Sequence, residues 1–86
     1  MAEDRSVDKI RRQINYLYLK HPNIHIIMRL PHHKRKSEII PVIIKNVYPN
    51  LFVVTEKNNE HEELHTIMYT EILTNHIEVL ELKNFK

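Results

Sequence analysis

The sequence contains no cysteine and no glycine among its 86 residues. Without cysteine, disulfides and thiolate metal sites are excluded, which suits a protein of the reducing cytoplasm. Without glycine, the P-loop, the dinucleotide fingerprint and other Gly-rich phosphate loops are excluded as well. Turns must use the four prolines and the asparagines instead, since Asn tolerates the left-handed conformation better than most other residues.

Long apolar runs are also absent. The longest apolar stretches, such as Ile39 to Ile44, are far too short to span a bilayer. The N-terminal sequence MAEDRSVDKIRR carries charges where a secretory signal needs an apolar run. A hydrophobic fraction of 42% fits one folded domain over residues 1–86, with little room for a deep catalytic cleft. We therefore expect a soluble, cytoplasmic, single-domain protein that has no contact with a membrane.

The net charge of +2 is divided unevenly along the chain. Residues 1–36 hold nine Lys or Arg against three acids, which gives +6, and residues 37–86 hold four against eight, which gives −4. Residues 20–36, here called the acid-free segment, contain five Lys or Arg, four His and no acid. If folding gathers this segment on one face, the protein presents a basic patch to an anionic partner.

The first element expected is an amphipathic helix over residues 6–20. Ser6 is a good N-cap. Apolar residues follow it at helical spacing, namely Val7, Ile10, Ile14 and Leu17. The helix should end at His21, because the residue before Pro22 is pushed out of the helical region.

From Asn23 onward the pattern favours β-structure. Apolar alternation and β-branched residues predict strands over residues 23–29, 39–47, 51–55, 64–69 and 76–82, with a helical turn over residues 70–73 and a bulge in the last strand. The fourth strand is ambiguous, because a helix from Asn59 to Leu73 fits the same residues. Pro41 cannot donate a ladder hydrogen bond, so its strand should be at an edge, bulged or bent. The expected fold is mainly β, a small SH3-like or Sm-like five-stranded barrel over about residues 23–82 behind the N-terminal helix.

His61-Glu62-Glu63-Leu64-His65 matches the H-E-x-x-H motif of zinc proteases. On a helix both histidines would share one face, but on the favoured strand this spacing does not converge on one metal. The candidates for a third ligand, His76 and Glu81, have no supporting motif. We therefore expect a solvated turn that runs into a strand, no metal site, no cofactor and no enzymatic activity.

The basic run His32-His33-Lys34-Arg35-Lys36, together with Arg29, is the sharper functional candidate. Clustered cations can contact nucleic-acid phosphates or an acidic protein partner. The alternative is a loop kept polar only for solubility. Tyr48 and Phe52 would add base stacking if both were exposed; otherwise they fill the core.

Two C-terminal segments carry a family resemblance. Residues 47–54, Val-Tyr-Pro-Asn-Leu-Phe-Val-Val, resemble the Tyr-Pro-Ser-x-Phe-Val segment of the Veg family of Gram-positive bacteria. Residues 69–79, Tyr-Thr-Glu-Ile-Leu-Thr-Asn-His-Ile-Glu-Val, resemble that family's Tyr-x-Asp-Ile-Leu-Thr-x-x-Val-Glu-Leu segment. The family's basic loop contains Asn-Gly-Gly, which Leu30 to His33 replace here, so the chain looks like a divergent member.

The resemblance implies an SH3-like barrel, no catalytic activity, and stimulation of biofilm formation through gene regulation. The partner it implies is a protein, such as a transcriptional regulator, and the chain itself would be a monomer or homodimer. The alternative function is an Sm-like nucleic-acid-binding module that uses the basic loop.

Overall fold

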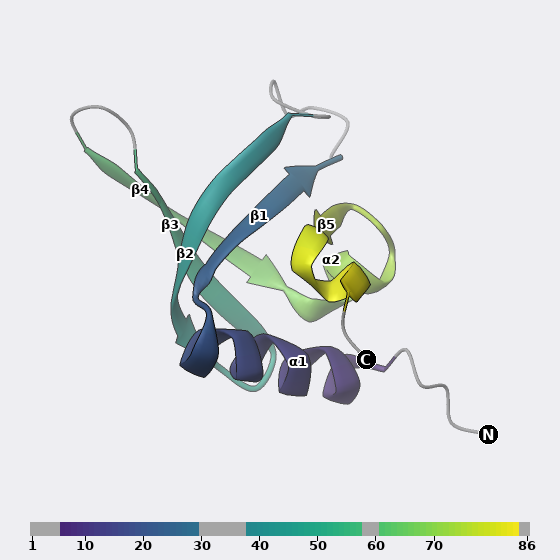
Figure 1. Cartoon of the computed structure of the whole chain (residues 1–86). Helices are drawn as coiled ribbons and strands as arrows, with labels where there is room; N and C mark the ends of the chain where they lie inside the picture. The colour runs from purple at the N-terminus through teal and green to yellow at the C-terminus, as the bar shows by residue number, and fades with distance from the viewer. Residues whose placement is uncertain (1–5, 30–37, 58–60, 85–86) are drawn as a thin grey trace.

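The computed structural model describes residues 6–29, 38–57 and 61–84 (Figure 1). Helix α1 (Val7–Lys20) follows the Ser6 cap, whose side chain accepts a 3.1 Å hydrogen bond from the Lys9 backbone N–H. The helix ends where the His21 N–H donates to the Leu17 carbonyl at 2.7 Å, directly before Pro22. The helix predicted over residues 6–20 is thus confirmed.

Five antiparallel strands form one sheet in the order β4-β3-β2-β1-β5. They are β1 (Asn23–Met28), β2 (Ile39–Val47), β3 (Leu51–Lys57), β4 (Glu62–Met68) and β5 (Ile77–Val79). Helix α2 (Tyr69–Leu73) follows β4, so the ambiguous segment is a strand and the predicted helical turn is present. The turn into β5 uses Asn75 at φ 65°, where a left-handed residue is needed and glycine is not available.

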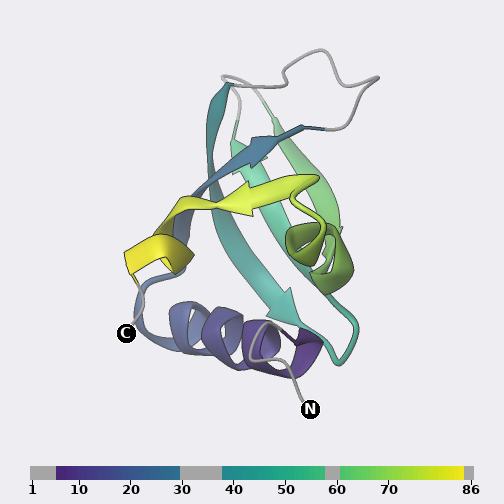
Figure 2. The same cartoon turned by 90° about the vertical axis from the view of Figure 1, so that its right-hand side faces the viewer.

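The sheet does not close into the expected barrel. Strands β4 and β5 are its two edges, and no ladder joins them in the part of the chain that the structure describes. Helix α2 connects these edges and contacts both strands, while α1 crosses one end of the sheet and contacts β2 (Figure 2). The predicted N-terminal helix and the predicted number of strands are confirmed, whereas the predicted closure into a barrel is wrong.

The last strand is shorter than predicted, because the chain turns into the 3₁₀ helix η1 (Leu80–Asn84) after Val79. The cause is a contact that sequence periodicity does not reveal. The Glu81 carboxylate accepts hydrogen bonds from the His25 backbone N–H at 2.9 Å and pairs with His25 Nδ1 at 2.8 Å. The Glu81 side chain thereby takes the place of a further strand residue beside β1. The apolar residues Leu80 and Leu82, which suggested a bulge in the strand, belong to η1.

Pro41 lies in a central strand, which excludes the edge position among the alternatives expected for it, and the local pairing explains how it is accommodated. It pairs with His25 of β1, whereas the β2–β3 ladder begins only at Ile43 and Thr55. The described residues of β3 therefore require no hydrogen bond from Pro41. The bulge of this strand is displaced from Pro41 and lies between Ile44 and Asn46.

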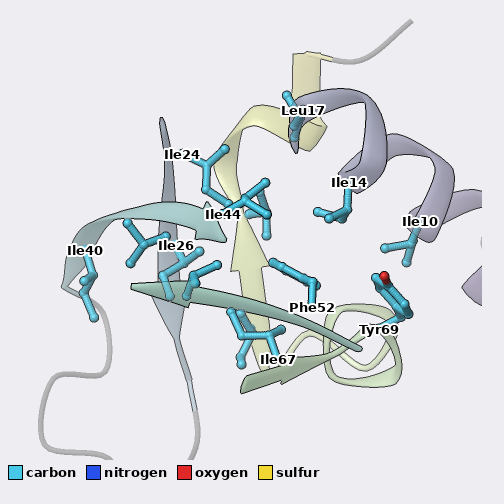
Figure 3. Close-up of a cluster of buried hydrophobic side chains, with 14 of the residues drawn as sticks. Ile10, Ile14, Leu17, Ile24, Ile26, Ile40, Ile44, Phe52, Ile67 and Tyr69 are labelled. Carbon is cyan, nitrogen blue, oxygen red and sulfur yellow. The ribbon is translucent and has the colours of Figure 1, made fainter. Parts of the chain in front are cut away.

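The core lies between α1 and the concave face of the sheet (Figure 3). Helix α1 contributes Ile10, Ile14 and Leu17 to this core, which also includes side chains from every strand. The largest fully buried side chains are Tyr69, Phe52, Ile14, Ile24, Ile26, Ile40, Ile67, Val54 and Val79.

Candidate binding surface

Arg29 is the one residue of the predicted basic site that the structure describes. Its backbone N–H donates to the His76 carbonyl at 2.6 Å, which continues the pairing of β1 with the segment before β5. Its guanidinium donates to Glu78 Oε1 at 2.5 Å. The other predicted residues lie outside the described residues: His32, His33, Lys34, Arg35 and Lys36.

Glu78 is shared between two cations from distant parts of the chain. Lys83 Nζ contacts its Oε2 at 2.5 Å, while Arg29 holds Oε1. Hydrogen bonds from Lys83 and then from Arg29 lower the pKa of Glu78, and they outweigh the opposing effect of burial. Arg29 therefore has a fixed position, and with 47% of its side chain exposed it is still accessible to a partner.

Arg29 lies at the rim of an open groove of about 690 Å³ between α1 and the C-terminal segment. The floor is apolar and consists of Ile10, Ile72, Ile77, Val79 and Leu82. The rim carries three cations, Lys9, Arg29 and Lys83, and one acid, Glu78. Sequence reasoning missed the groove, because its lining residues come from segments that only the folded chain brings together.

A second, smaller cleft of about 340 Å³ lies between α1 and the β2–β3 turn. Arg11 and Arg12 line it, but both form ion pairs with Asp8. Tyr48 is 47% exposed here, whereas Phe52 is completely buried. The two aromatic rings therefore cannot form a common stacking platform. Phe52 is part of the core, which was the alternative to base stacking.

The H-E-x-x-H match lies at the start of β4. Side chains alternate along a strand, so Glu62 points away from the face that carries Glu63 and His65. His61 and His65 are also four residue steps apart, which is roughly 13 Å along an extended backbone. Among the described residues, neither His76 nor Glu81 belongs to a group of metal-ligand side chains that includes His65. The protease geometry is absent from this part of the chain.

The two segments that carry the family resemblance meet in the fold. The Tyr69 hydroxyl donates to the Tyr48 carbonyl at 2.7 Å, and its ring stacks on Phe52 with centroids 5.7 Å apart. The Tyr69 N–H also donates to the Asn50 carbonyl at 3.4 Å. These contacts build the core and the β2–β3 turn. Later residues of the second segment, among them Ile72, Ile77 and Glu78, line the basic-rimmed groove.

Together these features define a small, mainly β domain with an N-terminal helix and a groove that has a basic rim. A family model described as biofilm formation stimulator VEG matches residues 5–80, and the chain belongs to this family. No curated protein matches the chain. In the described ranges, neither α1 nor α2 is long and apolar enough to cross a membrane.

Proposed function

We propose that the chain is a non-enzymatic regulatory binding protein of the cytoplasm, which modulates gene expression linked to biofilm formation by binding an acidic protein partner. Family membership supports the biological role. The observation that carries the binding mode is the position of Arg29, which is both part of the acid-free segment and part of the groove rim.

A protein partner is favoured by the chemistry of the groove. Its five apolar floor residues offer burial for aliphatic or aromatic side chains. Its three rim cations against one acid favour carboxylates beside those apolar groups. A nucleic-acid backbone needs the cations but gains little from an apolar floor, so an acidic segment with interspersed apolar residues fits better.

The second candidate function is nucleic-acid binding through the basic loop. The density of cations in the acid-free segment supports it. Two observations weigh against it: Phe52 is buried, and Asp8 pairs with the two arginines beside Tyr48.

Affinity capture from the native cytoplasm, with and without nuclease, separates the two functions. The proposal expects a protein to be retained after nuclease treatment and to bind again when purified. Its binding should fall with Arg29→Gln and not with Arg12→Gln, which changes a more exposed arginine that lines the second, smaller cleft. Loss of all captured protein on nuclease treatment would favour the nucleic-acid function. Sedimentation of the pure chain adds a check, because Sm-like proteins assemble into rings, whereas a monomer or dimer is expected here.

A further inference from the structure

The β3–β4 hairpin brings together three side chains of metal-ligand type. Glu56 of β3 is directly opposite Glu63 of β4, and His65 follows two residues later on the same face. His65 Nε2 is 3.1 Å from Glu56 Oε1 and 3.9 Å from Glu63 Oε1. One donor atom from each residue lies within 4.8 Å of the other two. Within residues 6–29, 38–57 and 61–84, this is the one such group of three.

We propose that Glu56, Glu63 and His65 form a binding site for a divalent transition metal, with Zn²⁺ as the best match. Zinc accepts one imidazole and two carboxylates, and bonds of about 2.0–2.2 Å place neighbouring donors of a tetrahedral site roughly 3.4 Å apart. The two measured separations from His65 bracket that value.

Burial and charge also favour a cation here. Like charges directly opposite each other on paired strands are destabilising, and Glu56 and Glu63 occupy such positions. Glu56 is only 4% exposed, so solvent screens this repulsion poorly. A dication between the two carboxylates replaces their repulsion with attraction to a common centre.

The backbone fixes the three residues before any ion binds. The β3–β4 ladder runs without a break from Leu51 and Met68 to Lys57 and Glu62. Glu56 lies on the protein side of the cluster, whereas the Glu63 side chain is 49% exposed and leaves a path from solvent. The His65–Glu56 hydrogen bond shows that these side chains also satisfy one another, so we expect folding without metal.

His61 provides the sharpest test of this arrangement. Its Nε2 lies 4.0 Å from Glu63 Oε2, and it is outside the group of three. The H-E-x-x-H reading needs His61 and His65 equally, whereas the proposed site needs His65 alone. The variants His61→Ala and His65→Ala therefore form a matched pair.

The experiment is calorimetric titration of the intact chain with ZnCl₂, repeated with MgCl₂, and with Co²⁺ absorption as a second readout. We expect one Zn²⁺ per chain. His65→Ala and Glu63→Gln should each weaken binding at least tenfold, since even loss of an outer-shell partner costs about 10- to 100-fold. His61→Ala should leave the affinity nearly unchanged, because His61 is outside the group of three. Circular dichroism confirms that each variant is folded. Glu63→Gln is preferred to Glu56→Gln as the carboxylate variant, because the buried Glu56→Gln change can prevent folding.

Three results would overturn the site. One is the absence of zinc binding up to millimolar concentration. Another is unchanged affinity in both His65→Ala and Glu63→Gln. The third is equal loss in His61→Ala and His65→Ala, which would indicate chelation by surface histidines. None of these outcomes bears on partner binding at the groove, which the captures with Arg29→Gln and Arg12→Gln test separately.

Discussion

The phenolic hydroxyl of Tyr69 donates a 2.7 Å hydrogen bond to the backbone carbonyl of Tyr48. This bond joins the start of α2 to the β2–β3 turn, 21 residues earlier in the chain. Tyr69 is fully buried and stacks on Phe52, which lies in the strand that follows the same turn. One side chain thus links the two family segments through both a hydrogen bond and a ring contact.

The variant Tyr69→Phe should destabilise the fold by about 1 kcal/mol, because the Tyr48 carbonyl loses its donor while the ring packing is kept. In a domain of this size that corresponds to a loss of about 4–8 °C in melting temperature. Denaturant unfolding measures the difference. Tyr48→Phe is the control: it keeps the carbonyl and changes a half-exposed ring, so it should be nearly neutral. Equal losses in the two variants would contradict the assignment.

Alkaline pH provides a second test of the same residue. Burial raises the pKa of Tyr69, and the positive charge of Arg11 opposes this only in part. A raised pKa means that the folded state keeps the proton longer than the unfolded state, whose tyrosine titrates near 10. The contribution of Tyr69 should be complete below about pH 10 and should decline as pH rises through the folded pKa. The stability difference between wild type and Tyr69→Phe, measured from pH 8 upward, should therefore shrink above pH 10; a constant or growing difference would refute this.

Glu81 should stabilise the fold through its contact with His25, at the point where the chain leaves β5. Burial raises the pKa of Glu81, but hydrogen bonds from His25 outweigh it and leave the pKa below its usual range. Glu81→Ala removes both bonds to His25 and should cost about 1–2 kcal/mol at neutral pH. Because the folded pKa is lowered, this contribution is present above the ordinary glutamate pKa and disappears as pH falls through the folded value.

Thermal unfolding from pH 7 down to pH 3 measures this contribution, with the exposed Glu62→Ala as control. Glu81→Ala should differ from wild type most at neutral pH and least at the acid end. If Glu62→Ala costs as much as Glu81→Ala, the contact with His25 is not the cause.

The ion pairs of Glu78 link stability to the groove. Its pKa is lowered by Lys83 and Arg29, so its contribution also disappears on acidification. Because both cations are exposed, Glu78→Gln should cost about 1 kcal/mol or less. The same change removes the one acid from the rim, so affinity for an acidic partner should rise, most clearly at low salt. A titration at two salt concentrations checks this, and weaker binding at both would contradict it.

Local patterns predicted the elements with the strongest periodicity. Ser6 and the apolar spacing that follows it located α1. Alternation located β1 to within one residue, and the run of β-branched residues gave the bounds of β2. The misses depend on contacts between distant residues. The end of β5 depends on a pair 56 residues apart, His25 and Glu81. The groove joins α1 to the C-terminal segment, and the Glu56–His65 contact requires the hairpin register.

The account rests most directly on the acid-free segment as the partner surface, and one measurement tests it. Replacing Lys34, Arg35 and Lys36 together by Gln should strongly weaken binding of the captured acidic partner at physiological salt. The melting temperature should stay the same or rise, because mutual repulsion of like charges is relieved. The control is a variant in which Gln replaces Arg11, Arg12 and Lys45. It loses the same charge elsewhere on the domain, and its affinity for the partner should be nearly unchanged. Undiminished binding by the Lys34, Arg35 and Lys36 variant would contradict the account and place the partner surface elsewhere on the domain.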